Sequence, residues 1–150
     1  MILIDANALT VLLVGLVDTR LIGRHNRTSI YEEQDFYDLL SVIESLENLV
    51  VLPNVWTEVD NLLNDFSGNH KYEYIERIVE VIKVASEKYI TSLKATESDC
   101  FFDLGITDSL LLEYSKECKL LVTADSKLSD YANAYNVMVY DMVKRRNERF

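Results

Sequence analysis

The chain has 150 residues, 49% of them hydrophobic and 10% aromatic, so it can bury a core of its own and does not have the composition of a disordered protein. Its net charge of −10 argues against a protein that coats nucleic acid through broad, salt-driven phosphate contacts, because such proteins are usually basic. The sequence has no apolar run long enough for a membrane span, no basic start typical of a signal peptide and no zinc-type cysteine spacing, so we expect one cytoplasmic domain over residues 1–150.

The N-terminal third predicts one strand and two helices. Met1–Ile4 is a short apolar strand, and Ala8–Val17 is apolar on nearly every side, which indicates a helix buried on more than one face. Arg20–Gln34 is polar, so we expect a loop there. The next helix is indicated by apolar residues at helical spacing, namely Phe36, Leu39, Leu40, Ile43 and Leu46.

The middle third predicts a second strand and two more helices. Leu49–Leu52 is apolar and is stopped by Pro53, the only proline in the chain. A helix follows, and we expect it to end near Ser67–Asn69, where small and polar residues gather. A long amphipathic helix is then expected from about His70 to Tyr89.

The last third predicts an alternation of strands and helices. The expected elements are a short strand over Ile90–Leu93, a loop over Lys94–Asp103, a helix over Ile106–Glu117, a strand over Lys119–Thr123, a helix over Ser126–Ala134 and a strand over Val137–Tyr140. Short apolar strands separated by helices imply right-handed crossovers and parallel pairing. We therefore expect an α/β fold with three layers, α/β/α, around a central parallel sheet of four or five strands.

Four acidic residues fall where a parallel sheet builds its ligand site, which is outside the carboxyl ends of the strands and near the topological switch point. Asp5 closes the first strand, and Asp125 comes just after the strand that ends at Thr123. Glu58 lies early in the helix that follows the second strand. Asp108 lies in the first turn of the helix before the third strand, where the helix dipole favours an anion. The four carboxylates can therefore reach one edge of the sheet.

Acidic residues occupy 25 of 150 positions, so each candidate has a structural interpretation as well. Asp108 suits a helix start and Asp125 suits a turn, whether or not they bind a ligand. Asp5 is different, because an unpaired carboxylate between an apolar strand and an apolar helix is costly to bury, and a bound cation relieves that cost. Several carboxylates without nearby His or Cys favour Mg²⁺ or Mn²⁺, ions that activate water and stabilise a phosphodiester under in-line attack.

Four segments resemble the sequence blocks of PIN-domain nucleases. Ile2–Leu9 is similar to the opening block, an apolar strand that ends in Asp-x-Asn, and Leu52–Val59 is similar to the second block, in which a helix supplies a Glu. Thr107–Tyr114 resembles the third block, where an Asp opens an apolar helix, and Leu120–Asp125 resembles the fourth, where Thr and Asp follow a strand. The blocks stand in the family's order and span residues 2–125.

The resemblance implies both a site and an activity. The catalytic and metal-binding residues that it implies are Asp5, Glu58, Asp108 and Asp125, with Mg²⁺ or Mn²⁺ as the cofactor. Asn7 and Thr123 would orient the carboxylates or the water. The small size is most like the VapC-type toxins of toxin–antitoxin pairs, so we expect a metal-dependent endoribonuclease that acts on RNA, with an antitoxin protein as a candidate partner.

Assembly and two insertions also bear on the partners. PIN toxins are commonly dimers, and the helices over Ala8–Val17 and Tyr72–Tyr89 have apolar surface to offer a homodimer. Residues 20–34 and 94–103 are polar insertions that depart from the family's pattern, and they would alter the choice of substrate or partner.

Two other functions stay open. A PIN-like scaffold that binds a protein without catalysis would suit the acidic surface. Asp5–Thr10 also faintly resembles the opening of haloacid-dehalogenase phosphatases, in which Asp5 would be a nucleophile. That family has a second Asp where Asn7 stands and uses a well-placed Lys, and it leaves Glu58 without a role.

Other conspicuous residues have structural interpretations. His25 is expected at the surface, Trp56 in the core and Asp130 in solvent. Basic residues gather at Arg20–Arg27 and at Lys144–Arg149, and we expect the second group to solvate a C-terminal tail.

Overall fold

The strands form one all-parallel sheet in the computed structural model, which describes residues 1–64 and 70–150. The strands of these residues are β1 (Ile2–Ile4), β2 (Leu49–Val51), β3 (Ser86–Glu87), β4 (Leu120–Thr123) and β5 (Val139–Asp141). Their order across the sheet is β3-β2-β1-β4-β5, and each neighbouring pair is parallel. The expected α/β class with a parallel sheet is confirmed, and the sheet has five strands.

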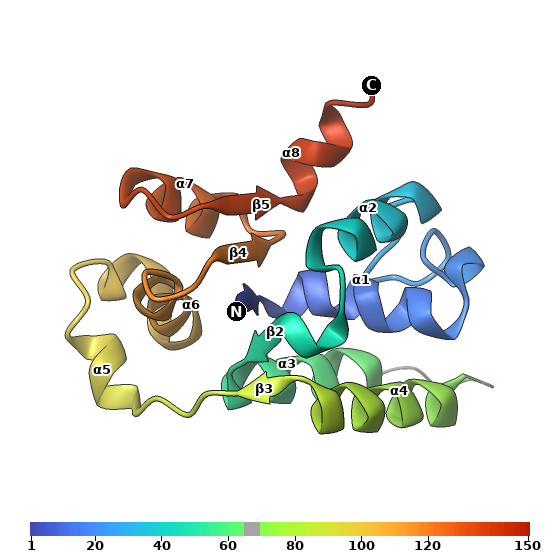
Figure 1. Ribbon diagram of the computed structural model, residues 1–150, viewed down its shortest axis with the longest axis horizontal. Helices are drawn as coiled ribbons and strands as arrows, with labels where there is room; N and C mark the ends of the chain where they lie inside the picture. Colours follow the sequence, from blue (N-terminus) through green and yellow to red (C-terminus); the bar gives the residue numbers. More distant parts are fainter. Residues whose placement is uncertain (65–69) are drawn as a thin grey trace.

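Helices cover both sides of this sheet. They are α1 (Ala6–Val17), α2 (Glu33–Ile43), α3 (Pro53–Asn64), α4 (Lys71–Val84), α5 (Ser92–Thr96), α6 (Phe101–Ser115), α7 (Ser126–Ala134) and α8 (Met142–Asn147). Figure 1 shows α1, α2 and α4 on one side of the strands and α5, α6 and α7 on the other. The three-layer arrangement is therefore confirmed.

The strand order sets the place where a ligand site is expected. β1 lies between β2 and β4, and the chain reverses its direction of travel across the sheet between these two neighbours. In the register of the central strands, Ile4 lies beside Val122, and Thr123 lies beside Asp141. A crevice for ligands forms outside the carboxyl ends of the strands at such a switch point. The residues that follow Ile4 and Thr123 therefore face one another there.

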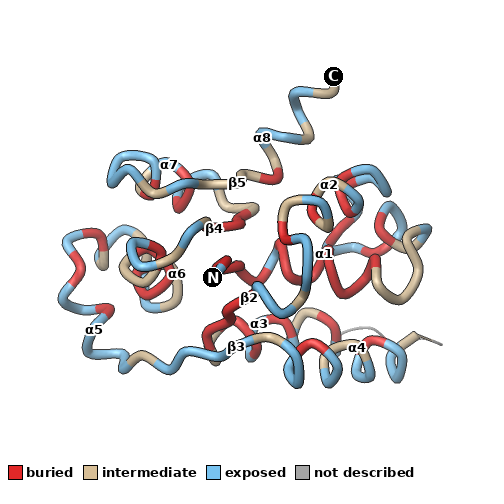
Figure 2. Tube along the Cα trace, in the orientation of Figure 1, coloured by how far each residue is buried: buried red, intermediate tan, exposed pale blue. Residues whose placement is uncertain are grey.

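Helix α1 forms the centre of the core, as its apolar sequence predicts. Figure 2 shows it buried along most of its length, and Leu9, Leu12 and Leu13 have no exposed surface. Gly15 is required where α2 crosses α1, because a Cβ on Gly15 would lie 2.1 Å from the ring of Phe36. Burying each of these leucines stabilises the fold by about 1.5–3 kcal/mol.

Helix α6 is bent at Gly105, whose φ of 78° lies in the left-handed region. This conformation is accessible to glycine at little cost and is unfavourable for residues with a Cβ. The bend separates a first turn over residues 101–104 from the longer helical part over residues 106–115, which is where the sequence predicts the helix. Asp108 therefore lies in the first turn of the longer part.

The segment between α4 and α6 differs from the prediction. The strand expected over Ile90–Leu93 is instead β3, a few residues earlier, and α4 ends at Val84 rather than near Tyr89. The loop expected over Lys94–Asp103 contains the end of α5 and the start of α6. Both strand residues of β3 are exposed, so this edge strand has no apolar pattern by which it could be recognised. The expected end of the third helix near Ser67–Asn69 lies outside the described residues.

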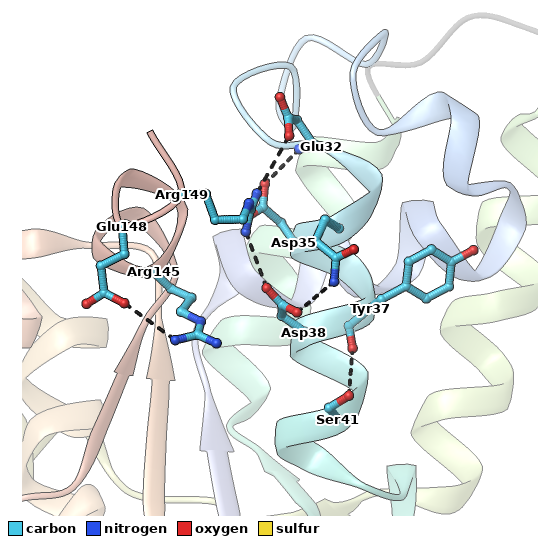
Figure 3. Close-up of polar contacts among 9 residues, drawn as sticks. Glu32, Asp35, Tyr37, Asp38, Ser41, Arg145, Glu148 and Arg149 are labelled. Atoms are coloured by element: carbon cyan, nitrogen blue, oxygen red, sulfur yellow. Dashed lines mark hydrogen bonds and ion pairs between the residues drawn. The ribbon is translucent and has the colours of Figure 1, made fainter.

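The C-terminal cations do not all solvate a tail, which corrects the prediction. Residues 142–147 form α8, and Arg149 follows it and binds the acidic face of α2 (Figure 3). Its guanidinium lies 2.6 Å from the carboxylate of Asp35 and 3.3 Å from that of Asp38, with Glu32 at 3.8 Å. Asp35 is only 2% exposed. The sequence does not show that a residue so deeply buried is the partner of Arg149.

Among residues 1–64 and 70–150, no helix combines the length and the apolar character that a membrane crossing requires.

Candidate active site

Asp5 is the most deeply buried of the predicted acids, with 5% of its surface exposed. Its Oδ1 accepts a hydrogen bond from the N–H of Ala8 at 2.9 Å, which caps α1. Its Oδ2 accepts one from the N–H of Ala124 at 3.0 Å and one from the hydroxyl of Thr123. A carboxylate offers about four lone-pair sites, so these three bonds leave one for a further ligand.

Thr123 connects Asp5 with Asp125. Its hydroxyl donates to Asp5 and accepts the backbone N–H of Asp125 at 2.9 Å. The Asp125 Oδ1 accepts the N–H of Leu128 at 2.9 Å and so caps α7. Thr123 is fully buried, and its hydroxyl holds the Asp5 carboxylate through this hydrogen bond. A role of Thr123 in orienting a metal ligand stays a prediction.

Glu58 and Asp108 come from the helices on either side of the switch point. Pro53 opens α3, where its missing N–H costs no helical hydrogen bond, and Glu58 follows on an exposed position. Asp108 is half-buried in α6. Within residues 1–64 and 70–150, no N–H or O–H group donates a hydrogen bond to the Asp108 carboxylate.

One pocket joins all four acids. It has a volume of about 400 Å³ and is lined by Asp5, Asn7, Glu58, Asp108 and Asp125 together with a wall of α6. Among the described residues, this lining includes no Lys, Arg or His. The structure therefore brings together the four acids that the sequence singles out, at the switch point between β1 and β4.

The electrostatics of the pocket show that the acids act on one another. Burial, together with the negative charges of Asp125, Asp5 and Glu58, raises the pKa of Asp108 to about 7. Burial also raises the pKa of Asp5 to about 6, against the lowering effect of its hydrogen bonds from Thr123, Ala8 and Ala124. Ionised carboxylates in such a site lack a nearby positive charge to offset their burial and repulsion.

The four carboxylates suit a hard cation in their chemistry, although their side chains are not gathered around one point. Four carboxylates without nitrogen or sulfur ligands match the oxygen-rich coordination of Mg²⁺ and Mn²⁺. Among the described residues, however, no three Asp, Glu, His or Cys side chains are close enough to hold an ion as they stand. The four carboxylates nevertheless line one pocket, and the charges of Asp125, Asp5 and Glu58 all raise the pKa of Asp108.

Of the other residues singled out from the sequence, Trp56 and Asp130 lie where they were expected and His25 does not, while the role of Asn7 stays a prediction. Asn7 lines the pocket from α1 with an exposed side chain. Trp56 is in the core and Asp130 is exposed, as expected. His25 is not at the surface but 2% exposed, and burial together with the nearby charge of Arg27 lowers its pKa to about 4. Ile22 and Thr28 of the same segment are buried as well.

The sequence did not reveal the wall of the pocket. Leu104, Ile106, Thr107 and Leu111 of α6 line it beside the acids. The available signal was Gly105, because a glycine just before Ile106 and Asp108 indicates a bend that turns this part of the helix toward the site.

The comparisons with known proteins add no relative to this description. No family model matches the chain, and neither the curated proteins nor the solved structures include a significant match to it.

Proposed function

We propose that the protein is a metal-dependent endoribonuclease whose active site is the four-acid pocket. The strongest support is that one pocket is lined by all four acids, Asp5, Glu58, Asp108 and Asp125. Within it, the charges of the other three acids raise the pKa of Asp108. Carboxylates gathered in this way at a sheet switch point suit a cation more than any single structural role. The same four residues are those that the resemblance to PIN-domain nucleases implies.

Asp5 and Asp125 would hold the catalytic ion, and Glu58 and Asp108 would hold the attacking water or a second ion. When bound, Mg²⁺ or Mn²⁺ supplies the positive charge that activates water and stabilises the phosphodiester oxygens. Asp5 suits its role because its hydrogen bonds to Ala8, Thr123 and Ala124 fix its direction and leave one lone pair. Asp108 suits the water-holding role because it is half-buried in α6 and lines the same pocket as the other three acids.

The test is cleavage of a mixed RNA preparation by the purified full-length chain. We expect no cleavage in EDTA and cleavage after addition of Mg²⁺ or Mn²⁺. Cleavage that continues unchanged in excess EDTA would contradict the proposed role of the carboxylates, and so would the absence of cleavage with either ion.

The alternative enzyme has less support. A phosphatase of the haloacid-dehalogenase type uses a Lys near its nucleophile, and the described lining of the pocket includes none. A nuclease forms no acyl-phosphate on Asp5, so failure of beryllium fluoride to bind would agree with the proposal. A non-catalytic scaffold remains the outcome if the folded protein binds metal and RNA but cuts nothing.

The proposal extends to partners and location. The choice of RNA, the cytoplasmic location and an antitoxin partner rest on the resemblance to VapC-type toxins. A homodimer is supported by an exposed apolar stripe on α4. Its residues are spaced as in a pair of packed helices, and their exposed fractions are 78% for Tyr72, 38% for Ile75, 43% for Val79 and 48% for Ile82. The apolar surface of α1, which the sequence also offered for assembly, is used within the core instead.

A further inference from the structure

Two hollows lie between α7 and α8, at the same end of the sheet as the acid pocket. Asp125 lines the acid pocket, and the next residue, Ser126, lines a neighbouring hollow of about 420 Å³ together with Lys144 of α8. A second hollow, of about 250 Å³, is lined by Asn133 of α7 and by Lys144 and Arg145 of α8. Lys144 lines both hollows, and so do the carboxylates of Asp141 and Glu148. The two hollows are called here the α7–α8 trough, and the first of them includes the residue that follows Asp125.

The register of the sheet explains why α8 lies at this edge. Asp141, the last residue of β5, lies beside Thr123, the last residue of β4. Helix α8 starts at the next residue, so its basic residues lie at the same end of the sheet as Asp125. The trough is therefore on the active side of the molecule.

The cations of the trough are available to a ligand. Lys144 is exposed and has no carboxylate partner among the described residues. Arg145 contacts Glu148 at 3.4 Å, but both side chains are more than half exposed, and such a pair contributes little. The carboxylate of Asp141 accepts the backbone N–H of Lys144 at 3.0 Å and so has a structural role in capping α8.

Other cations near the pocket are already engaged. Lys127 of α7 lies 3.0 Å from Asp103, and Arg149 is held by the acids of α2. The acid pocket itself has no described Lys or Arg in its lining. In a chain with a net charge of −10, an RNA strand needs local positive charge to stay at an acidic site.

We propose that the α7–α8 trough binds the phosphates of the RNA strand next to the scissile bond, with Lys144 and Arg145 as the contacts. This inference rests on the proposed nuclease function and adds the surface that holds the substrate. Phosphate contacts position a strand without reading its sequence. Lys144 and Arg145 therefore increase affinity for RNA of any sequence and leave the chemical step to the four acids.

The experiment compares the double variant Lys144→Gln/Arg145→Gln with Lys71→Gln/Lys83→Gln. The control pair lies on α4, is exposed, and removes the same two positive charges. Cleavage of a fluorescent single-stranded RNA of random sequence is measured with Mn²⁺ over a range of salt concentrations. Folding of each variant is checked by its circular dichroism and melting curve.

We expect the trough variant to lose roughly tenfold in kcat/KM at about 0.1 M salt, through KM, with a salt dependence shallower by about 0.7 in log–log slope for each contact. The α4 control should match the wild type. If the two double variants behave alike, or if kcat falls while the salt slope is unchanged, the trough does not bind the strand although the nuclease function stands. If the wild type cuts no RNA, the nuclease function and this inference both fail.

Discussion

The Asp5 carboxylate has a hydrogen-bond arrangement that favours its charged form in spite of its burial. Three donors converge on it, and the Thr123 hydroxyl is the only side chain among the three. That hydroxyl also receives the backbone N–H of Asp125, so it fixes two of the proposed ligands at once. Outer partners of this kind control both the direction and the basicity of metal ligands.

Replacing Thr123 by Val keeps the shape and removes the hydroxyl. We expect the Mn²⁺ concentration for half-maximal cleavage to rise roughly 10- to 100-fold, because outer partners of metal ligands typically contribute that much. Thr123→Ser keeps the hydroxyl and is the matched control. A metal titration of the cleavage rate for the three proteins makes the comparison, and equal curves for Val and Ser would show that the hydroxyl has no such role.

The raised pKa of Asp108 makes the stability of the metal-free protein depend on pH. Its folded pKa of about 7 is above the ordinary value of 3.8, so protonation favours the folded state. The stability that this provides is fully present below about pH 4 and is lost as the pH rises through 7. In EDTA, the melting temperature of the wild type should therefore fall over this range more steeply than that of Asp108→Asn.

At pH 8 the Asn variant should be the more stable protein without metal, because one buried negative charge is gone. Saturating Mg²⁺ should reduce the difference, since the ion stabilises the native carboxylates selectively. Parallel melting curves across the pH range in EDTA would count against the mutual repulsion of the four acids.

Residues at strand ends were predictable and residues in the polar insertions were not. Asp5 and Asp125 could be placed because a strand's carboxyl end is visible in the apolar pattern before it. His25 could not be placed, because its burial depends on packing of a loop against α4, where its ring lies 5.8 Å from that of Tyr74. The residues next to His25 in the sequence do not indicate its contact with Tyr74.

At the scale of elements, the bend in α6 is the feature that positions Asp108. Gly105 has no atom within 4 Å of the place where a Cβ would be, so the effect of Gly105→Ala would come from the backbone alone. A Cβ at this positive φ costs about 1–2 kcal/mol. In a chain of this length the melting temperature should fall by about 2–4 °C per kcal/mol.

Cleavage should fall as well, because relaxation of the bend moves the first turn of the longer helical part. Gly23→Ala is the control, since Gly23 lacks a positive φ and its Cβ would lie no closer than 3.9 Å to Tyr31. A stable Gly105→Ala with full activity would mean that the bend does not position Asp108.

Elements with a strong apolar pattern were predicted closely, and those formed by exposed residues were not. The helix over Ser126–Ala134 has the predicted bounds, and β1, β2 and β4 match within about a residue. By contrast, α5 has a single buried residue, Ala95, and α8 has only Met142. Short elements that bury so little depend on tertiary contacts that a periodic pattern does not carry.

At the scale of the whole molecule, the exposed stripe of α4 is the surface available for assembly. Pairing two copies of α4 in antiparallel fashion places Ile75 against Val79 and Tyr72 against Ile82 of the other copy.

Light scattering at micromolar concentrations should therefore find a dimer, and Ile75→Lys/Val79→Lys should be monomeric. Phe102→Lys is the control, because Phe102 is fully exposed on α6, away from the stripe. A wild-type monomer, or an unchanged dimer in the α4 variant, would contradict pairing through this helix.

The variant Asp5→Asn tests most directly whether the four-acid pocket is a metal-dependent nuclease site. The substitution keeps the shape of Asp5 and removes one full charge from the place where the ion would bind. The measurement is RNA cleavage with Mn²⁺ by wild type, Asp5→Asn and Asp130→Asn at equal folded concentration, with the exposed Asp130 of α7 as the control. Loss of metal activation should reduce the rate of Asp5→Asn about a thousandfold, and Asp130→Asn should cut like the wild type. If Asp5→Asn cuts at the wild-type rate, the pocket is not the active site and the nuclease proposal fails with it.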